Sequence, residues 1–524
     1  MPKEAAAGGV EAPKQQVRSA EVIASLCLAT DLGMGFPFEH GLSATLTTMR
    51  LCDVMGVDTE TAKVTYYVSL LMYSGCTVDA EERSRIFGGS LSQHHTHRQH
   101  GSQWESLVGI AGALPSPEAS WPQRTYQMVT RLPRARSFAL RHFGAFCEVA
   151  GMLAERLGLP GAVSELFPYL SERWDGASLL GRARGEDVPL PLRITHVGRD
   201  ATYQRLMGDD DHVVETIRSR SGHAFDPAVA DAFLANATEV LGPAEPQESV
   251  WNAVLAAEPG PTLTLADGQV DRALWAMGAF ADTASPYLTG HSAGVGELAC
   301  RAAGILGMGE ADATALRRAG YLHDLGRAAV NPRVWAKAGP LSADEWEQVR
   351  LHPYHTERVL VRSPFLAPYA RIACAHHERL DASGYHRGAN AAALPKAARL
   401  LAAADAFQCK TEPRPYREAM SPEQATHVLV TRAEGGRLDP EMVVAVAEAA
   451  DQETPQIRRP AGLTEREVEV IGLLARGRAT KQIAASLGIS TKTADRHIQN
   501  IYGKIGVSSR AAATLYAVEN GLVQ

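Results

Sequence analysis

The sequence has no run of the roughly 18 consecutive apolar residues that a membrane-spanning helix needs, so we expect no membrane partner. Its start, residues 1–18, lacks the apolar core of a signal peptide, and we expect a flexible tail there. The seven cysteines are scattered singly with no C-x-x-C pair, which argues against a disulfide framework or a thiolate zinc site and favours the reducing cytoplasm. A net charge of -7 gives no global sign of nucleic-acid binding, so any such role has to come from a local patch.

What the sequence does contain is an internal repeat. Sliding the chain against itself by 291 − 40 = 251 residues places His40 on His291 and Asp31 on Asp282. The aligned segments continue into apolar stretches with the spacing of amphipathic helices. The repeat predicts two copies of one structural unit.

A second match between the copies has a shorter offset. Residues 171–182 align with residues 377–388, an offset of 377 − 171 = 206, so the first copy carries about 251 − 206 = 45 extra residues in its middle. Both copies lack the alternating apolar pattern of strands and are rich in Ala, Leu and Arg. The sequence therefore predicts an all-α fold with two tandem helical bundles.

Pro- and Gly-rich or polar segments mark the boundaries between domains. We predict a first bundle at residues 19–241, a linker at 242–263, a second bundle at 264–450, a linker at 451–462 and a C-terminal domain at 463–524.

The second copy contains seven side chains that can bind metal ions, in otherwise apolar sequence. They are His291, His323, Asp324, His352, His376, His377 and Asp405. An unpaired polar group costs several kcal/mol to bury, and a metal ion removes that cost. A His next to an Asp suits a two-metal centre, because the carboxylate can bridge two ions through its two oxygens while imidazoles cap each side.

Five motifs follow one another in this copy. They are HDLGR (His323–Arg327), RLHPYHTERVL (Arg350–Leu360), HHERLDASGYHRG (His376–Gly388), RLLAAADAF (Arg399–Phe407) and RPYRE (Arg414–Glu418). With these motifs, residues 264–450 resemble the HD-GYP branch of the HD phosphohydrolases. The resemblance implies an all-helical bundle with a two-iron or related centre that hydrolyses phosphodiesters such as cyclic di-GMP.

The resemblance also implies a role for each of these residues. One divalent cation, with Fe or Mn favoured, would be held by His291, His323, Asp324 and Asp405, and a second by Asp324, His352, His376 and His377. Asp324 and Arg327 would have catalytic roles.

The chain departs from the family at several positions. Arg327 stands where a lysine is usual, which keeps the positive charge but replaces a compact ammonium by a planar fork. Ala382 and His386 replace a Gly and a Pro, and Gln408–Lys410 replace Asp-Ala-Leu. Tyr287 replaces the acidic residue of three-metal members, so we expect two metals at most.

The first copy has lost most of these ligands. His40 is kept, whereas the positions of five of the other six ligands fall on Met72, Tyr73, Leu170, Ser171 and Arg199, with Asp200 in place of Arg199 after a slip of one residue. We expect this copy to be catalytically inactive and to serve as a ligand pocket or as a structural partner.

A cluster of histidines lies in the extra residues of the first copy. His94, His95, His97 and His100 could bind zinc or respond to protons, but such a run is more often a solvated loop. We assign no site to it.

The C-terminal residues 463–524 have the pattern of a helix-turn-helix domain. Thr464 and Glu467 form a capping box, and Ser490 caps a later helix whose apolar stripe is Ala494, Ile498, Ile501 and Ile505. Between residues 473 and 510 there are seven Lys or Arg side chains and one Asp, a local excess of 7 − 1 = +6. This basic tip predicts a phosphate-binding surface.

The segment resembles the LuxR-type DNA-binding domain along its full length, which implies four helices, a recognition helix in the major groove of double-stranded DNA, and a last helix from Arg510 to Val518 that often forms a homodimer contact. The residues predicted to face DNA are Lys481, Lys492, Thr493, Arg496, His497, Asn500 and Lys504. Asp495, where a basic or neutral residue is common, would weaken backbone affinity or discriminate among bases.

These observations predict a cytoplasmic transcription regulator that carries an HD-GYP-like phosphodiesterase or nucleotide-sensing domain. Two alternatives stay open: a metal-dependent phosphohydrolase acting on cyclic dinucleotides or other phosphodiesters, and a regulator whose metal site is structural.

Overall fold

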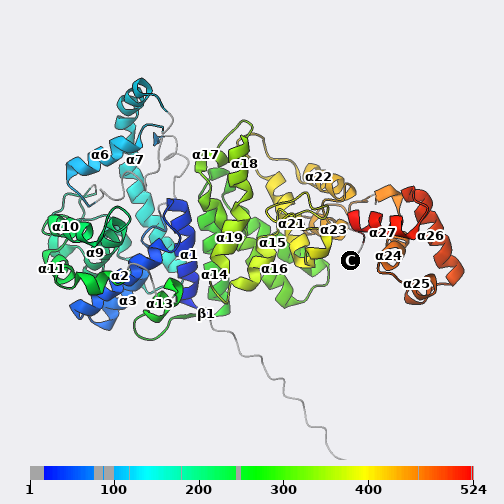
Figure 1. The fold of residues 1–524 in the computed structure, drawn as a ribbon, viewed down its shortest axis with the longest axis horizontal. Helices are drawn as coiled ribbons and strands as arrows, with labels where there is room; N and C mark the ends of the chain where they lie inside the picture. Colours follow the sequence, from blue (N-terminus) through cyan, green and yellow to red (C-terminus); the bar gives the residue numbers. More distant parts are fainter. Residues whose placement is uncertain are drawn as a thin grey trace, which may run out of the picture. The chain divides into compact units, whose positions relative to one another are not determined.

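The computed structural model describes residues 17–75, 86–87, 100–116, 119–178, 180–243, 249–457, 460–520 and 522. The chain divides into two compact units, residues 1–276 and 277–524, and each is described by itself. The predicted all-α class is confirmed (Figure 1). Within the described residues the only sheet pairs β1 (Val17–Arg18) with β2 (Thr264–Leu265), antiparallel. No described helix combines the length and the apolar character that crossing a membrane requires.

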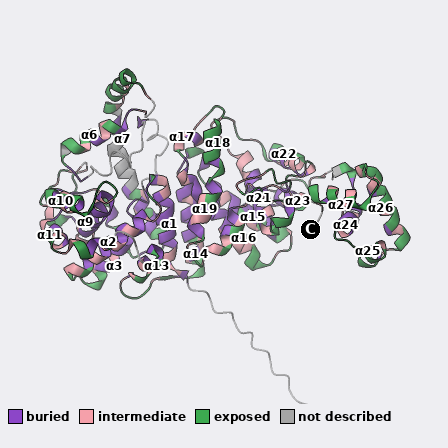
Figure 2. Cartoon of the chain, viewed as in Figure 1, coloured by how far each residue is buried: buried purple, intermediate pink, exposed green. Residues whose placement is uncertain are grey.

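The first unit contains the first copy of the repeat. Its helices are α1 (Ser19–Met34), α2 (His40–Met55), α3 (Thr59–Leu71), α6 (Gln103–Ala113), α7 (Trp121–Arg156), α8 (Gly161–Ser164), η2 (Phe167–Tyr169), η3 (Gly185–Asp187), α9 (Leu190–Gln204), α10 (Asp210–Arg220), α11 (Pro227–Ala235), α12 (Ala237–Leu241) and α13 (Val250–Ala256). Helix α2 packs against α1, α3 and α9 in a buried core (Figure 2). Helices α6 and α7 lie in the part of the chain where the first copy has its extra residues.

The second copy is built from a further series of helices. They are α14 (Asp267–Asp282), η4 (Pro286–Leu288), α15 (His291–Ile305), α16 (Glu310–Leu322), η5 (Leu325–Ala329), α17 (Pro332–Trp335), α18 (Ala343–Arg350), α19 (His352–Leu360), α20 (Ala367–Ala373), η6 (Ala391–Ala393), α21 (Lys396–Thr411), α22 (Pro422–Glu434) and α23 (Pro440–Ala449). Helix α15 is central and packs against α16, α21 and α23. Helices α15 and α16 approach closely, since a Cβ atom on Gly320 would lie 2.4 Å from the Cα of Gly296.

Matching hydrogen bonds in the two copies support the repeat. At the start of α2, both carboxylate oxygens of Asp31 accept the Gly41 amide, at 3.0 and 3.1 Å. At the start of α15, the Asp282 carboxylate accepts the Ser292 amide in the same way, at 3.1 and 3.4 Å. Both pairs are related by 251 positions, because 31 + 251 = 282 and 41 + 251 = 292.

The second match, at the offset of 206 residues, is supported by a backbone hydrogen bond that occurs in both copies. The Gly185 amide donates to the Trp174 carbonyl at 2.8 Å, and the Ala391 amide donates to the Leu380 carbonyl at 3.0 Å. These pairs are related by 206 positions, because 174 + 206 = 380 and 185 + 206 = 391. The change of offset therefore corresponds to extra chain between α3 and α9, with the helical framework retained on either side.

The C-terminal domain contains η7 (Pro460–Gly462), α24 (Glu465–Ala475), α25 (Thr480–Ser486), α26 (Thr491–Ile505) and α27 (Arg510–Glu519). The predicted capping box is present: the Glu467 amide donates to Thr464 Oγ1 at 3.3 Å, and the Thr464 amide donates to Glu467 Oε2 at 2.7 Å. Ser490 caps α26 by accepting the Thr493 amide at 3.1 Å. The turn between α25 and α26 contains Gly488 at φ +63°, a left-handed conformation that glycine adopts without strain.

Candidate functional site

The seven predicted ligands come from five places in the second bundle. His291 begins α15, His323 and Asp324 follow α16, His352 begins α19, His376 and His377 follow α20, and Asp405 lies in α21. The structure brings all seven together. All are buried except His377, whose exposure is intermediate. Helix ends thus deliver most of these side chains to one point inside the bundle.

Asp324 is at the centre of this cluster, and its two oxygens face different histidines. Oδ2 lies 3.5 Å from His291 Nε2 and 3.0 Å from His323 Nε2. Oδ1 lies 3.3 Å from His352 Nε2 and 3.5 Å from His376 Nε2. This is the arrangement expected of a carboxylate that bridges two cations, each capped by imidazoles.

Asp405 and His377 complete the two groups. Asp405 Oδ1 lies 3.4 Å from His291 Nε2 and 3.9 Å from His323 Nε2, and its Oδ2 lies 3.9 Å from His377 Nδ1. The trio His291, His323 and Asp324 and the trio His352, His376 and His377 each place their ligand atoms within 4.8 Å of one another.

Backbone carbonyls fix the tautomers of three of the histidines. The Nδ1 atoms of His323, His352 and His376 donate to the carbonyls three residues earlier in the chain, at 2.7, 2.5 and 2.6 Å. A neutral imidazole with its proton on Nδ1 carries a lone pair on Nε2. All three Nε2 atoms therefore point into the cluster as electron-pair donors, the form in which imidazole binds a metal.

These lone pairs oppose one another unless a cation lies among them. His352 Nε2 and His376 Nε2 are only 3.2 Å apart, and with both protons on Nδ1 neither atom can donate to the other. The buried atoms Asp324 Oδ1, Asp324 Oδ2, His291 Nε2, His323 Nε2 and Asp405 Oδ1 make no hydrogen bond of acceptable geometry with the described residues. Buried polar atoms without partners are costly, and cations would satisfy them. The donor set therefore fits divalent metal ions.

The protonation states of the two carboxylates and of His376 agree with metal binding, whereas His291 differs: burial lowers its pKa, but the hydrogen bonds to Asp405 and Glu412 raise it to about 10. Burial raises the pKa of Asp324, but Arg327 and His323 lower it more, so the net pKa lies well below the usual range. Burial also raises the pKa of Asp405, and the surrounding histidines bring it well below the usual range. Burial lowers the pKa of His376 to about 3. Ionised carboxylates and neutral imidazoles are the forms that coordinate metals.

Arg327 lies against this centre. Its Nε is 2.8 Å from Asp324 Oδ2, and its guanidinium lies 5.0 Å from the centroid of the Trp335 ring. The neighbouring Gly326 is required by a close approach, since a Cβ atom there would lie 2.0 Å from the His352 carbonyl oxygen. The η5 turn and the start of α19 thus pack without space for a side chain.

The next residues are three positions where the chain departs from the family, Ala382, His386 and Tyr287, together with Tyr385. Ala382 has φ +60°, a conformation that favours the glycine usual there. The Tyr385 ring lies over His377, with centroids 4.6 Å apart. His386 Nε2 is 3.7 Å from the Glu357 carboxylate. The Tyr287 carbonyl accepts a hydrogen bond from Arg414 Nη1 at 2.7 Å.

One acidic residue next to the centre was missed by the sequence reasoning. Glu412 Oε2 lies 2.8 Å from His291 Nδ1, on the side of the ring away from the other ligands. Its position directly after α21, two residues before the RPYRE motif, was the available signal.

The first copy gathers different side chains at the equivalent place. Arg199, which aligns with Asp405, is buried, and its guanidinium lies 5.3 Å from the Tyr73 ring centroid and next to His100 Nε2. Asp200, the alternative match, pairs with Arg220 at 2.5 Å. Among the described residues, groups of three or more potential metal ligands within reach of one another occur only in the second unit.

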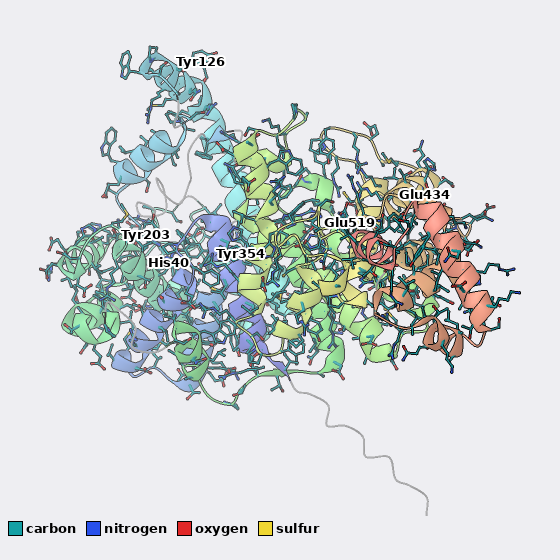
Figure 3. The ribbon with its side chains drawn as sticks, turned by 45° about the vertical axis from the view of Figure 1, so that its right-hand side comes forward. His40, Tyr126, Tyr203, Tyr354, Glu434 and Glu519 are labelled. Carbon is teal, nitrogen blue, oxygen red and sulfur yellow. The ribbon has the colours of Figure 1, made fainter. Side chains whose placement is uncertain are left out.

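His40 lies in an aromatic environment. Its ring is 4.6 Å from Phe36 and 6.0 Å from Tyr203 between centroids. Figure 3 labels His40 and Tyr203. Burial and the Arg199 charge lower the His40 pKa to about 4. The predicted histidine cluster falls mostly outside the described residues, which include His100 but not His94, His95 or His97.

The predicted DNA-contacting residues lie on two helices of the C-terminal domain. On α26 the side chains of Ala494, Ile498 and Ile501 are buried in the core, and on the remaining faces Lys492, Arg496 and Asn500 are exposed, while Thr493 and His497 are intermediate. Lys481 is exposed on α25.

Lys504 makes contacts within the domain. Its Nζ lies 2.6 Å from Glu467 Oε2 and donates to the Gly462 carbonyl at 3.0 Å. The ammonium thereby ties the end of α26 to the capping box of α24.

Comparisons with known proteins agree with this geometry. The family model described as HD domain matches residues 277–442, and the one described as bacterial regulatory proteins, luxR family, matches residues 461–517. The 3'3'-cGAMP-specific phosphodiesterase 3 of Vibrio cholerae is 28% identical over 82% of this chain and 94% of its own length. The cyclic di-GMP phosphodiesterase response regulator RpfG of Xanthomonas campestris pv. campestris is 31% identical over 54% of this chain and 74% of its own length.

A solved structure shares the fold. The crystal structure of a cyclic GMP-AMP specific phosphodiesterase from V. cholerae aligns with a TM-score of 0.56 at 24% identity, over 83% of this chain and 98% of that chain. The likeness of fold therefore extends well beyond the residues that the HD domain model matches.

Proposed function

We propose, from the premise that this chain belongs to the HD domain family in its HD-GYP-type branch, that it is a DNA-binding transcription regulator whose HD domain hydrolyses a phosphodiester with two divalent cations. A cyclic dinucleotide is the substrate class that its relatives suggest, since those relatives are named as cyclic di-GMP and cGAMP phosphodiesterases. Iron or manganese suits the mixed histidine and carboxylate ligands. The cytoplasm, where the DNA is, is the proposed place of action.

The observation that carries this proposal is the position of Asp324. Each of its oxygens faces its own pair of imidazole Nε2 atoms, within 3.0 to 3.5 Å. Three of these imidazoles, His323, His352 and His376, carry their proton on Nδ1, so three electron-pair donors face the oxygens of one carboxylate, and cations between them satisfy these atoms.

The residues of the centre have different roles in this proposal. His291, His323, Asp324 and Asp405 would hold one cation, and Asp324, His352, His376 and His377 the other. A bound pair of divalent cations supplies Lewis acidity toward the phosphodiester and toward the attacking water. The carbonyls that accept the histidine Nδ1 protons keep the Nε2 lone pairs oriented. Arg327 holds Asp324 in place and brings positive charge to the edge of the cluster, where a phosphate would lie.

The first copy has a non-catalytic role in this proposal. The Arg199 guanidinium is buried where the second copy has the Asp405 carboxylate, and a permanent cation there opposes the binding of metal ions. This copy is then a structural partner or a sensory pocket.

The C-terminal domain binds the chain to specific sites on DNA in this proposal. The exposed Lys481, Lys492 and Arg496 provide charge for phosphates or base edges in the geometry of a helix-turn-helix domain. A homodimer, in which two such domains read two half-sites, fits the family of this domain.

One experiment separates this proposal from its alternatives. The purified chain is loaded with Mn²⁺ or, without oxygen, with Fe²⁺, and is then incubated with cyclic di-GMP and with 3'3'-cGAMP. We expect hydrolysis by the wild type and none by a His323→Ala/Asp324→Ala variant. Hydrolysis without measurable DNA binding would favour a phosphohydrolase, whereas DNA binding with metal bound and no turnover would favour a structural metal site.

DNA binding is tested with the same protein. Selection from a pool of random duplexes should enrich one motif for the wild type and none for an Arg496→Ala/Lys492→Ala variant. Arg218→Ala, an exposed arginine of the first unit paired with Glu215, is the matched control and should select the wild-type motif.

A further inference from the structure

We infer that Glu412 is a positioning residue that orients His291 for metal binding. The inference rests on the proposed function, because it takes His291 as a ligand of one of the two cations. Glu412 lies outside the five sequence motifs, so the family resemblance implies no role for it.

The carboxylate contacts the back of the imidazole. Glu412 Oε2 lies 2.8 Å from His291 Nδ1, and His291 Nε2 faces Asp324 Oδ2 at 3.5 Å and Asp405 Oδ1 at 3.4 Å. With Nδ1 donating to Glu412, Nε2 is the ring atom that faces the cluster, and in neutral His291 it offers its lone pair to a cation. The ring is thereby fixed in both rotation and tautomer.

His291 differs in this respect from three other histidines of the centre. His323, His352 and His376 donate Nδ1 to backbone carbonyls three residues earlier. His291 donates to a charged side chain instead. A carboxylate is a stronger acceptor than a carbonyl and raises the basicity of the imidazole, which strengthens its bond to a metal.

Glu412 is itself held by two neighbours. Gln408 Nε2 donates to Glu412 Oε1 at 2.8 Å, one helical turn earlier in the chain. Arg414 Nη2 donates to Glu412 Oε2 at 2.8 Å. The carboxylate is largely buried, with 15% of its side chain exposed. Both oxygens therefore have partners that prevent the side chain from turning to solvent.

The backbone of α15 is shaped to admit this arrangement. A Cβ atom on Gly294 would lie 2.5 Å from Gln408 Nε2. Gly294 lies one turn after His291, so the Gln408 amide rests directly on the helix that carries the ligand. The residue that holds Glu412 in this way is Gln408, at a position where the family usually has an aspartate.

The test measures metal affinity rather than turnover. The full-length wild type, Glu412→Gln and Glu412→Asp are stripped with a chelator and titrated with Mn²⁺ against a fluorescent chelating dye. For Glu412→Gln we expect the affinity of one of the two sites to fall by about 10–100-fold, the usual effect of losing a partner that orients a ligand histidine. Glu412→Asp, which keeps the charge, should retain more affinity than Glu412→Gln.

A matched control and a second variant exclude a general loss of structure. Glu441→Gln removes a carboxylate that pairs with Lys396 at 3.0 Å on the surface of the same bundle, and it should leave both Mn²⁺ affinities unchanged. Chelator-stripped Glu412→Gln should still be folded at the temperature of the titration, which its circular dichroism spectrum checks. Gln408→Ala, which loosens Glu412 without removing it, gives a smaller loss at the same site and serves if Glu412→Gln does not fold.

The outcomes are distinct. Wild-type affinity at both sites in Glu412→Gln overturns the inference and leaves the proposed function standing. An equal loss in Glu412→Gln and Glu441→Gln also overturns it, because the effect would then be general. A wild type that binds no Mn²⁺ overturns the proposed function and the inference with it.

Discussion

Replacing His40 by phenylalanine should make the first bundle less sensitive to acid and leave the metal centre unchanged. His40 is buried, with its Nε2 lacking a hydrogen-bond partner among the described residues, and it lies among the rings of Phe36 and Tyr203. An aromatic ring without a titratable group fits that environment and removes no hydrogen bond from Nε2.

The size of the effect follows from the pKa of His40. Burial and Arg199 lower it from 6.5 to about 4 in the folded protein. Because the folded-state pKa is depressed, the stability that neutral His40 contributes is complete above pH 6.5 and is lost as the pH falls toward 4. A difference of about 2.5 pKa units corresponds to about 3 kcal/mol in total, of which about 2 kcal/mol is lost by pH 5.

Hydrogen exchange of α2 in the full-length protein measures this directly. Between pH 7 and pH 5 the opening free energy of α2 should fall by about 2 kcal/mol less in His40→Phe than in the wild type. His100 and His196, whose pKa values are also lowered by burial, keep their part of the acid sensitivity in both proteins. An equal fall in both proteins would refute the reasoning, and so would a loss of Mn²⁺ binding in the variant, because His40 would then be a ligand.

Three further predictions concern the second bundle and the C-terminal domain. Gly326→Ala should lower the melting temperature of the HD domain by several degrees, since the new Cβ would meet the His352 carbonyl oxygen at 2.0 Å, whereas Gly339→Ala, where the space is open, should not. Removal of the metal by a chelator should lower the unfolding free energy of the HD domain, measured by calorimetry. The loss should be about 2.7 kcal/mol per site when the free metal concentration before chelation is 100 times the Kd. An unchanged unfolding transition would mean that no metal stabilises the fold. Lys481→Ala should reduce the slope of log affinity against log salt for random duplex DNA by about one unit, and an unchanged slope would place Lys481 away from the phosphates.

The framework of this protein could be predicted from the sequence because it depends on local patterns. The offset of 251 residues anticipated that Asp31 and Asp282 make the same contact at the start of equivalent helices. The capping box at Thr464 and the cap at Ser490 are interactions between residues three positions apart. Such signals need no knowledge of the tertiary fold.

The contacts that the sequence analysis did not predict join residues that are far apart in the chain. Glu412 reaches His291 across 121 positions, and Lys504 reaches Glu467 across 37. The position of Glu412 just before the RPYRE motif marks it as near the site, but no spacing in the sequence identifies His291 as its partner or Glu467 as the partner of Lys504. The burial of Arg199 beside Tyr73 is likewise a consequence of how α9 packs in the first bundle. The alignment placed Arg199 at the position of Asp405, but it did not show that the guanidinium is buried beside Tyr73 and His100.

The central claim is that the cluster around Asp324 holds two cations. Elemental analysis of the full-length chain, purified without chelators and dialysed against Mn²⁺ or anaerobic Fe²⁺, tests it most directly, with His323→Ala/Asp324→Ala treated in parallel. The account predicts about two ions per wild-type chain and a clear loss in the double variant. Less than one ion per wild-type chain, or equal metal content in the two proteins, would contradict it.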